Sequence, residues 1–203
     1  DLSGNFDAFL CGDDSITQAV IDKSLPRLQI ISKYGIGLDK INVDYATKKA
    51  LPVLFTPGVN HTTVAEHTFG LLLGITKDIQ SNAVAVQNGE WVAGWKKPVG
   101  NEIMGKTIGI LGLGRIGKEV AIRARAFGMS IIAFDPYFDD SFASENGVKR
   151  CSSMNEVLNN SDVVSLHCFL NDETEDMINA AKIAEMRDQV IVLNCARGEL
   201  VNT

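Results

Sequence analysis

The sequence has few of the residues that build disulfide-rich, metal-binding or membrane-spanning proteins. Its 203 residues include 4 cysteines and 3 histidines, and the cysteines show no paired spacing. We therefore expect small, buried, reduced cysteines and no metal site. No apolar run approaches the ~20 residues that cross a bilayer, and no signal peptide is visible. These absences predict a cytoplasmic protein that has no membrane partner.

An excess of positive charge is also lacking. The formal net charge is -6, with 45% hydrophobic and 22% charged residues. An acidic chain of this kind is a poor partner for nucleic acid. The apolar fraction is typical of a globular protein that buries a core, and the length suits one large domain or two small ones.

Short apolar runs alternate with helical patterns along the chain, which predicts an α/β fold with parallel sheets. The expected strands span residues 6–11, 28–33, 53–55, 107–113, 130–134, 162–167 and 189–194. Clear helical patterns lie between them at residues 17–24, 116–126, 154–159 and 180–186.

A domain boundary is predicted at Pro57-Gly58, directly before the longest helical pattern. That pattern runs from about residue 61 to Gln80, and Thr63 and Glu66 have capping-box spacing. Its apolar residues cover more than one side, which indicates packing on several sides. The expected domains are residues 1–57 and 58–203.

The segment "TIGILGLGRIGKEVAIRARAFGMSIIAFDP" reads as strand, glycine turn, helix, strand and acid. Gly112 permits a tight turn, Gly114 lets a pyrophosphate approach the backbone, and Gly117 allows close helix–strand packing. The following helix would offer free N–H groups to the phosphates. Asp135 follows Gly117 by 18 residues and suits the ribose hydroxyls of NAD.

The last apolar run leads into "NCARGELV", with Arg197 where the strand should emerge. Ligands of open parallel sheets bind at this edge. Taken alone, Arg197 could equally be a surface residue.

Four segments together resemble the D-isomer-specific 2-hydroxyacid dehydrogenases, most closely their phosphoglycerate dehydrogenase branch. They are "SKYGIGLDKINVDYAT", "TPGVNHTTVAEHTFGLLL", the glycine turn and "LNCARGELV". The resemblance covers nearly the whole chain. It implies a Rossmann-type doubly wound parallel sheet plus a flavodoxin-like substrate domain, both incomplete in this chain, with NAD in the cleft between them.

The resemblance also implies roles for individual residues. Arg197 matches the catalytic arginine, which binds the substrate carboxylate and polarises the reacting oxygen. The substrate-binding matches are Ile36, Gly37 and Asn60. The cofactor-binding matches are Val64, Gly112, Gly114, Arg115, Ile116, Gly117, Asp135, His167, Cys168, Cys195 and Ala196.

The family's catalytic glutamate and histidine follow the arginine by a few tens of residues, beyond Thr203. The histidines that are present have other expected roles: His61 at a helix start, His67 packed in a helix, and His167 beside the cofactor or buried. We therefore expect this piece to be inactive, although its parent is an enzyme. A non-catalytic NAD-responsive scaffold, or a structural oligomer-forming remnant, remains an alternative.

The substrate is left open between a phosphorylated and a non-phosphorylated D-2-hydroxy or 2-keto acid. Lys33 falls where the phosphoglycerate branch has a phosphate-holding arginine, and it could equally be an ordinary surface lysine. Asp13 and Asp14 nearby would repel a phosphate. A homodimer through the nucleotide domains is also expected, from the long apolar helix and from Trp91 and Trp95 after it.

Overall fold

The computed structural model describes residues 6–90 and 99–202, and its chain divides into two compact units. The first unit is Asp1–Asn60 and the second is His61–Thr203. The division lies a few residues beyond Pro57-Gly58. Trp91 and Trp95, expected at an interface, lie outside the described residues.

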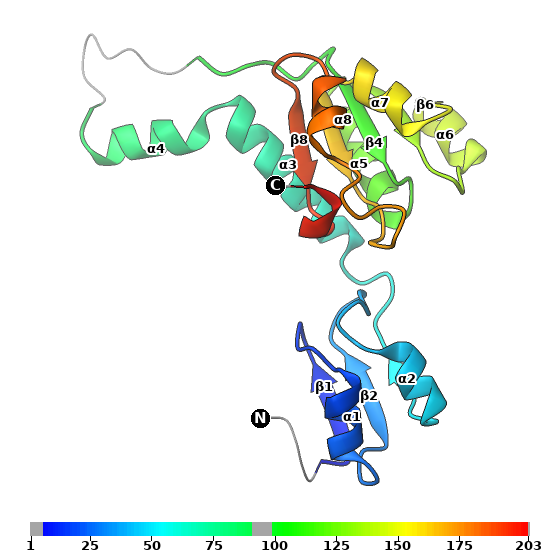
Figure 1. Ribbon diagram of the computed structural model, residues 1–203. Coiled ribbons are helices and arrows are strands. Elements are labelled where there is room, and N and C mark those ends of the chain that lie inside the picture. The colour runs from blue at the N-terminus through cyan, green and yellow to red at the C-terminus, as the bar shows by residue number, and fades with distance from the viewer. Residues whose placement is uncertain (1–5, 91–98, 203) are drawn as a thin grey trace. The chain divides into compact units, whose positions relative to one another are not determined.

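The first unit is a three-stranded parallel sheet in the order β1-β2-β3 with two helices (Figure 1). Its core holds buried residues of the strands and of both connections between them, including Ile16, Ile21 and Ile31. The elements are β1 (Ala8–Cys11), α1 (Gln18–Ser24), β2 (Ile30–Lys33), α2 (Val43–Lys48) and β3 (Val53–Leu54).

The second unit is a five-stranded parallel sheet in the order β6-β5-β4-β7-β8 (Figure 1). Its strands are β4 (Thr107–Leu111), β5 (Ser130–Phe134), β6 (Val148–Arg150), β7 (Val163–Leu166) and β8 (Ile191–Asn194). Its helices are α3 (His61–Thr76), α4 (Ile79–Gln87), α5 (Arg115–Ala126), α6 (Asp140–Asn146), α7 (Met154–Asn160) and α8 (Ala180–Ala184), followed by the short 3₁₀ turn Gly198–Leu200. The order reverses between β4 and β7, which is the topological switch point of a Rossmann sheet.

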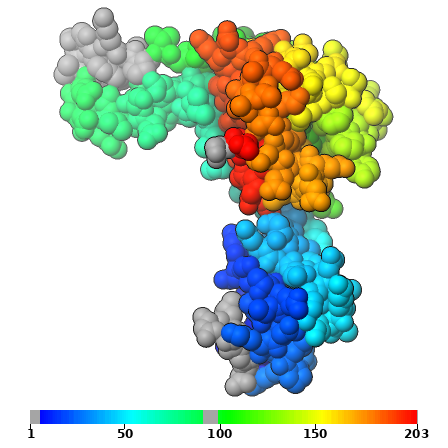
Figure 2. All heavy atoms as spheres, in the orientation of Figure 1, coloured from blue at the N-terminus to red at the C-terminus, as the bar shows by residue number. Residues whose placement is uncertain are grey.

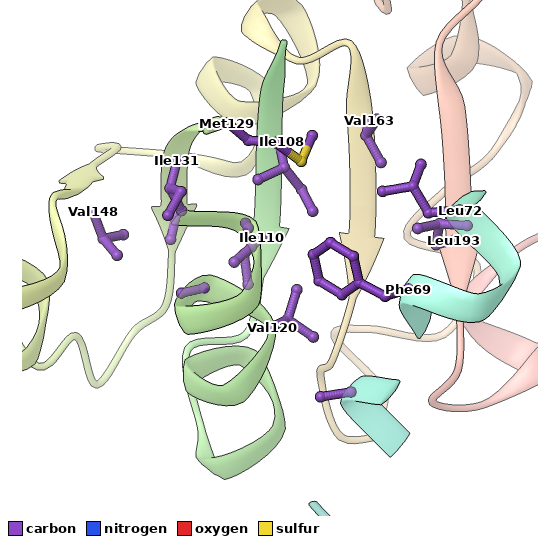
Figure 3. Close-up of a cluster of buried hydrophobic side chains, with 14 of the residues drawn as sticks. Phe69, Leu72, Ile108, Ile110, Val120, Met129, Ile131, Val148, Val163 and Leu193 are labelled. Atoms are coloured by element: carbon purple, nitrogen blue, oxygen red, sulfur yellow. The ribbon is translucent and has the colours of Figure 1, made fainter. Parts of the chain in front are cut away.

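Helices pack on both faces of the second sheet, and successive strand residues point into opposite cores. Ile131 and Val163 join the core beneath α3, α5 and α6. Their neighbours Ile132 and Val164 join the opposite core, beneath α7. Figure 3 shows Phe69 and Leu72 of α3 against β4 and β8 side chains in the first of these cores. The predicted α/β class and the Rossmann-type sheet are confirmed.

The single long helix expected to run to Gln80 is wrong, because the chain breaks between α3 and α4. Asp78 has a left-handed backbone, with φ of 52°. The expected capping box is also wrong. The helix already begins at His61, so Glu66 lies within it and pairs with Arg123 Nη2 at 3.6 Å.

α4 extends away from the body of the second unit in the space-filling view (Figure 2). Of its residues only Ala85 is buried. Among the described residues, no helix combines the length and apolar character needed to cross a bilayer. β6 was not expected from the sequence, since its residues Val148–Arg150 include two exposed cations.

Candidate active site

The turn after β4 requires glycine for two independent reasons. Gly112 has φ of 95°, a conformation that side chains disfavour. A methyl group added there would lie 2.7 Å from the carbonyl oxygen of His167. The N–H of Gly112 donates to the Phe134 carbonyl at 3.0 Å, so the turn is anchored to β5.

Gly117 and Gly114 differ in what surrounds them. A methyl group at Gly117 would lie 2.1 Å from the Gly112 carbonyl oxygen, so α5 presses directly on the turn. Gly114 caps α5 and has open space where a side chain would stand. The open space and the free N–H groups of the first turn of α5 form a cradle for an anion.

Asp135 ties the glycine turn to the segment after β5. Its Oδ2 accepts from the Leu113 N–H at 2.6 Å, and its Oδ1 accepts from the Tyr137 N–H at 2.7 Å. Each carboxylate oxygen keeps a further lone pair. The side chain is therefore fixed in position and still able to accept bonds from two hydroxyl groups.

His167 follows β7 with its ring largely enclosed. Its Nε2 and the buried Ser165 Oγ are 2.8 Å apart, and its Nδ1 is buried with no partner among the described residues. Burial lowers the pKa of His167 to about 4, so the ring is neutral near pH 7. Burial and the charge of Asp135 raise the pKa of the Cys168 thiol to about 11.

The end of β8 and the start of α3 form an open pocket with a volume of about 470 Å³. Val64 and Cys195, both predicted to bind the cofactor, line it together. His67 was expected to pack within its helix, but it is exposed and lines this pocket. The lining residues are Thr63, Val64, His67, Leu71, Asn194 and Cys195.

Asn194 holds the loop that carries Arg197. Its Nδ2 donates to the Arg197 carbonyl at 2.7 Å, and its Oδ1 accepts from the Ala196 N–H at 3.1 Å. The half-buried Arg197 side chain donates from Nη1 to the Ala196 carbonyl at 2.9 Å. Sequence reasoning did not assign this role to Asn194, although an asparagine at the start of a turn is the usual signal for it.

The other expected site residues fall into the two units. Arg115 and Ile116 open α5, directly after the cradle. Ile36 and Gly37 lie in the loop after β2, and Asn60 ends the first unit. In that loop Gly35 has φ of 137°, and Thr56 Oγ1 accepts from its N–H at 3.3 Å and donates to its carbonyl at 3.0 Å.

Residues 69–203 match the model of the D-isomer specific 2-hydroxyacid dehydrogenase, NAD binding domain. The chain belongs to that family. Its NAD cofactor fits the second unit on three observations: the open cradle at Gly114, the helix start at Arg115 and the anchored carboxylate of Asp135.

Two curated relatives illustrate the range of names in the family. The chain is 39% identical over 187 residues to D-3-phosphoglycerate dehydrogenase of Methanocaldococcus jannaschii, covering 92% of this chain and 35% of that protein. It is 41% identical over 175 residues to hydroxypyruvate reductase of Thermotoga maritima, covering 86% and 55%. The chain thus spans well under two thirds of either relative.

A solved structure of similar fold is D-lactate dehydrogenase from Aquifex aeolicus complexed with NAD and lactic acid. It has a TM-score of 0.87 and 33% sequence identity, covering 97% of this chain and 58% of that one. The family relationship therefore rests on sequence and fold together.

Lys33 is not a surface lysine, which was one of the two roles predicted for it. It ends β2 and is only 5% exposed. Its ammonium donates to the Gly12 carbonyl and lies 3.0 Å from Asp13 Oδ1. In this family member, the cation at the carboxyl edge of the first sheet is therefore already paired with an acid.

Proposed function

We propose that this chain forms the nucleotide-binding unit, and part of the substrate-binding unit, of an NAD-dependent dehydrogenase for D-2-hydroxy acids. One observation carries the proposal. The Gly112–Gly117 turn, which packs without space for side chains at either end, leaves Gly114 open beside a helix start and an anchored Asp135. That arrangement offers separate places for a pyrophosphate and for a ribose.

The proposed roles follow from position. The first turn of α5, with Arg115 and Ile116, holds the pyrophosphate, and Asp135 accepts from the ribose hydroxyls. His167, Cys168, Cys195, Ala196 and Val64 line the remainder of the nucleotide site. Bound NAD supplies the acceptor for the hydride that leaves the substrate carbon.

Arg197 is proposed as the catalytic residue. A guanidinium stays charged at all relevant pH values and presents a planar fork. It can bind the substrate carboxylate and stabilise charge on the reacting oxygen. For the first unit, the backbone N–H groups of Ile36 and Gly37 are proposed to bind a carboxylate of the substrate, and Asn60 is proposed as a further substrate-binding residue.

The test measures the dissociation constants of NAD and NADP from the chain by calorimetry. We expect NAD to bind and NADP to bind more weakly, and Asp135→Ala to reduce this preference by weakening NAD. The fold of the variant is checked by thermal unfolding. Equal affinity of the wild type for both cofactors would contradict the proposal, whereas NAD binding by a full-length protein without turnover would favour the non-catalytic scaffold.

The substrate is proposed to be a D-2-hydroxy acid or the matching 2-keto acid, with D-3-phosphoglycerate or a close relative as the first candidate and a non-phosphorylated acid as the alternative. The pairing of Lys33 with Asp13 specifically favours the non-phosphorylated alternative, because the ammonium is already neutralised. The test compares kcat/KM of the full-length protein for a phosphorylated and a non-phosphorylated 2-keto acid of equal chain length. A strong preference for the phosphorylated acid would reject that alternative.

A homodimer through the second unit is also proposed. Exposed apolar side chains run along α3 and α4, and α4 buries little of its own surface. They are Leu71, Ile75, Ile79, Val84 and Val86. Ile79→Glu is expected to shift the sedimentation of the protein from dimer to monomer, while Ser81→Glu on the same helix provides a control for added charge. A wild-type monomer at micromolar concentration would contradict this proposal.

A further inference from the structure

Two ion pairs flank the segment that follows Asp135. Lys118 on α5 places its Nζ 2.5 Å from Asp139 Oδ2. Arg150, at the end of β6, places its Nη1 3.4 Å from Asp140 Oδ2. Both acids lie directly beyond Asp135 in the chain, where α6 begins.

The Lys118–Asp139 pair is held on several sides. Asp139 also caps α6, since its Oδ1 accepts from the Phe142 N–H at 3.0 Å. The Lys118 ammonium lies 5.2 Å from the centre of the Phe142 ring. The bond from Lys118, with the capping bond, holds the pKa of Asp139 below its usual value, so the acid stays charged. Arg150 is similarly placed 5.0 Å from the Phe138 ring.

Arg115 stands in contrast to these two cations. It opens α5 and is exposed, and none of the ion pairs found in residues 6–90 and 99–202 includes it. The cation expected at the pyrophosphate is thus available, whereas Lys118 and Arg150 are each paired with an acid that follows Asp135 in the chain.

We propose that Asp139, by holding Lys118, is a second determinant of NAD selectivity beside Asp135. This rests on the proposed nucleotide site. NADP differs from NAD by a phosphate on the adenine ribose, the ribose that Asp135 binds. Such a phosphate needs a cation in place of the acid. While Lys118 remains paired with Asp139, the phosphate meets negative charge from Asp135 and Asp139 and gains no cation.

The proposal predicts that removing Asp135 alone leaves NADP weakly bound. Asp135→Ala removes one repulsive charge, but Lys118 stays with Asp139. In Asp135→Ala/Asp139→Asn the new asparagine can still cap α6 through its side-chain oxygen. The ammonium of Lys118 is then released to bind the phosphate. We expect NADP to bind about tenfold more tightly to this double variant than to Asp135→Ala.

The test measures NAD and NADP dissociation constants by calorimetry at low and high salt. Asp135→Ala/Glu145→Gln is the matched control, because it removes one negative charge from α6, the helix that Asp139 caps, without removing a partner of Lys118. We expect no comparable gain for it. Adding Lys118→Gln to the first double variant should remove most of the gain, and high salt should weaken it.

Two outcomes would overturn the proposal. One is a double variant that binds NADP no more tightly than Asp135→Ala while still binding NAD. The other is a gain that persists with Lys118→Gln or appears equally in the Glu145 control, because it would then come from net charge. A wild-type protein that binds neither cofactor would instead reject the nucleotide site itself, and this proposal with it.

Discussion

Two glycine-containing loops, each following a parallel strand, differ in how tightly the protein surrounds them. In the second unit, Gly112 and Gly117 have backbone atoms 2.7 Å and 2.1 Å from where a side chain would begin. In the first unit, the nearest atom to such a position at Gly35 is the Cε of Lys33, at 3.4 Å. That loop is instead held through hydrogen bonds to Thr56.

The difference indicates two ways to hold a glycine-containing loop in one conformation. The nucleotide turn is fixed by packing, because backbone atoms cannot move aside as a side chain can. The loop of the first unit is held by the hydrogen bonds of Thr56, and the positive φ angle of Gly35 disfavours a side chain there. Substitutions should therefore be far more costly in the first case.

The largest effect is expected from Gly117→Ala. Its methyl group would meet the Gly112 carbonyl, so α5 must shift from the turn at a cost of about 3 kcal/mol in unfolding free energy. NAD binding should be lost with it. Urea unfolding and calorimetric titration measure the two effects.

Gly114→Ala is the matched control for that prediction. Its φ of -72° suits any residue, and its surroundings are open. The unfolding free energy should change by about 0.5 kcal/mol at most, while NAD binding weakens because the methyl group enters the phosphate cradle. Equal destabilisation by the two substitutions would contradict the packing argument.

A second prediction concerns His167, whose carbonyl packs against Gly112. Burial lowers the pKa of the His167 ring from 6.5 to about 4. Between these pH values the ring is protonated in the unfolded chain and neutral in the folded protein. The stability is therefore intact above pH 6.5 and is lost as pH falls toward 4, by about 1 kcal/mol per pH unit. Urea unfolding across this range should show a steeper decline for the wild type than for His167→Gln. Parallel declines would refute the assignment.

Gly35→Ala tests the first-unit loop, with a smaller expected effect. The φ of 137° disfavours a side chain, and we expect a loss of about 1.5 kcal/mol in unfolding free energy. Gly12→Ala, at the end of the neighbouring strand, has open surroundings and no positive φ, so it should be nearly neutral. If Gly35→Ala lowered the unfolding free energy as much as Gly117→Ala, the two loops would not differ in how tightly they are packed.

The smallest effect is expected from Thr56→Val. It removes two side-chain hydrogen bonds to Gly35 at an exposed position, which is worth about 0.5 kcal/mol in thermal or urea unfolding. Thr56→Ser keeps the hydroxyl group and should restore the loss. Failure of serine to do so would mean that the hydroxyl does not hold this loop.

The sequence predicted local features well where one segment carries the whole signal. The strands and the glycine turn before α5 fall within a few residues of their expected places. The break at Asp78 was missed, because the apolar pattern continues across it and no glycine or proline marks it. β6 was missed because its side chains are mostly exposed, so no apolar run identifies it.

The sequence by itself determined the family, because four matching segments lie along the chain. It also determined the Rossmann turn, because Gly112, Gly114 and Gly117 act through the backbone and Asp135 follows at a fixed spacing within the same βαβ unit. Only the tertiary structure decided which charges are paired. Asp13 holds Lys33 and Asp139 holds Lys118 across about twenty residues of chain in each case. Spacing along a sequence does not specify such a contact, because the fold brings the ends of separate elements together and the nearest opposite charge then forms the pair.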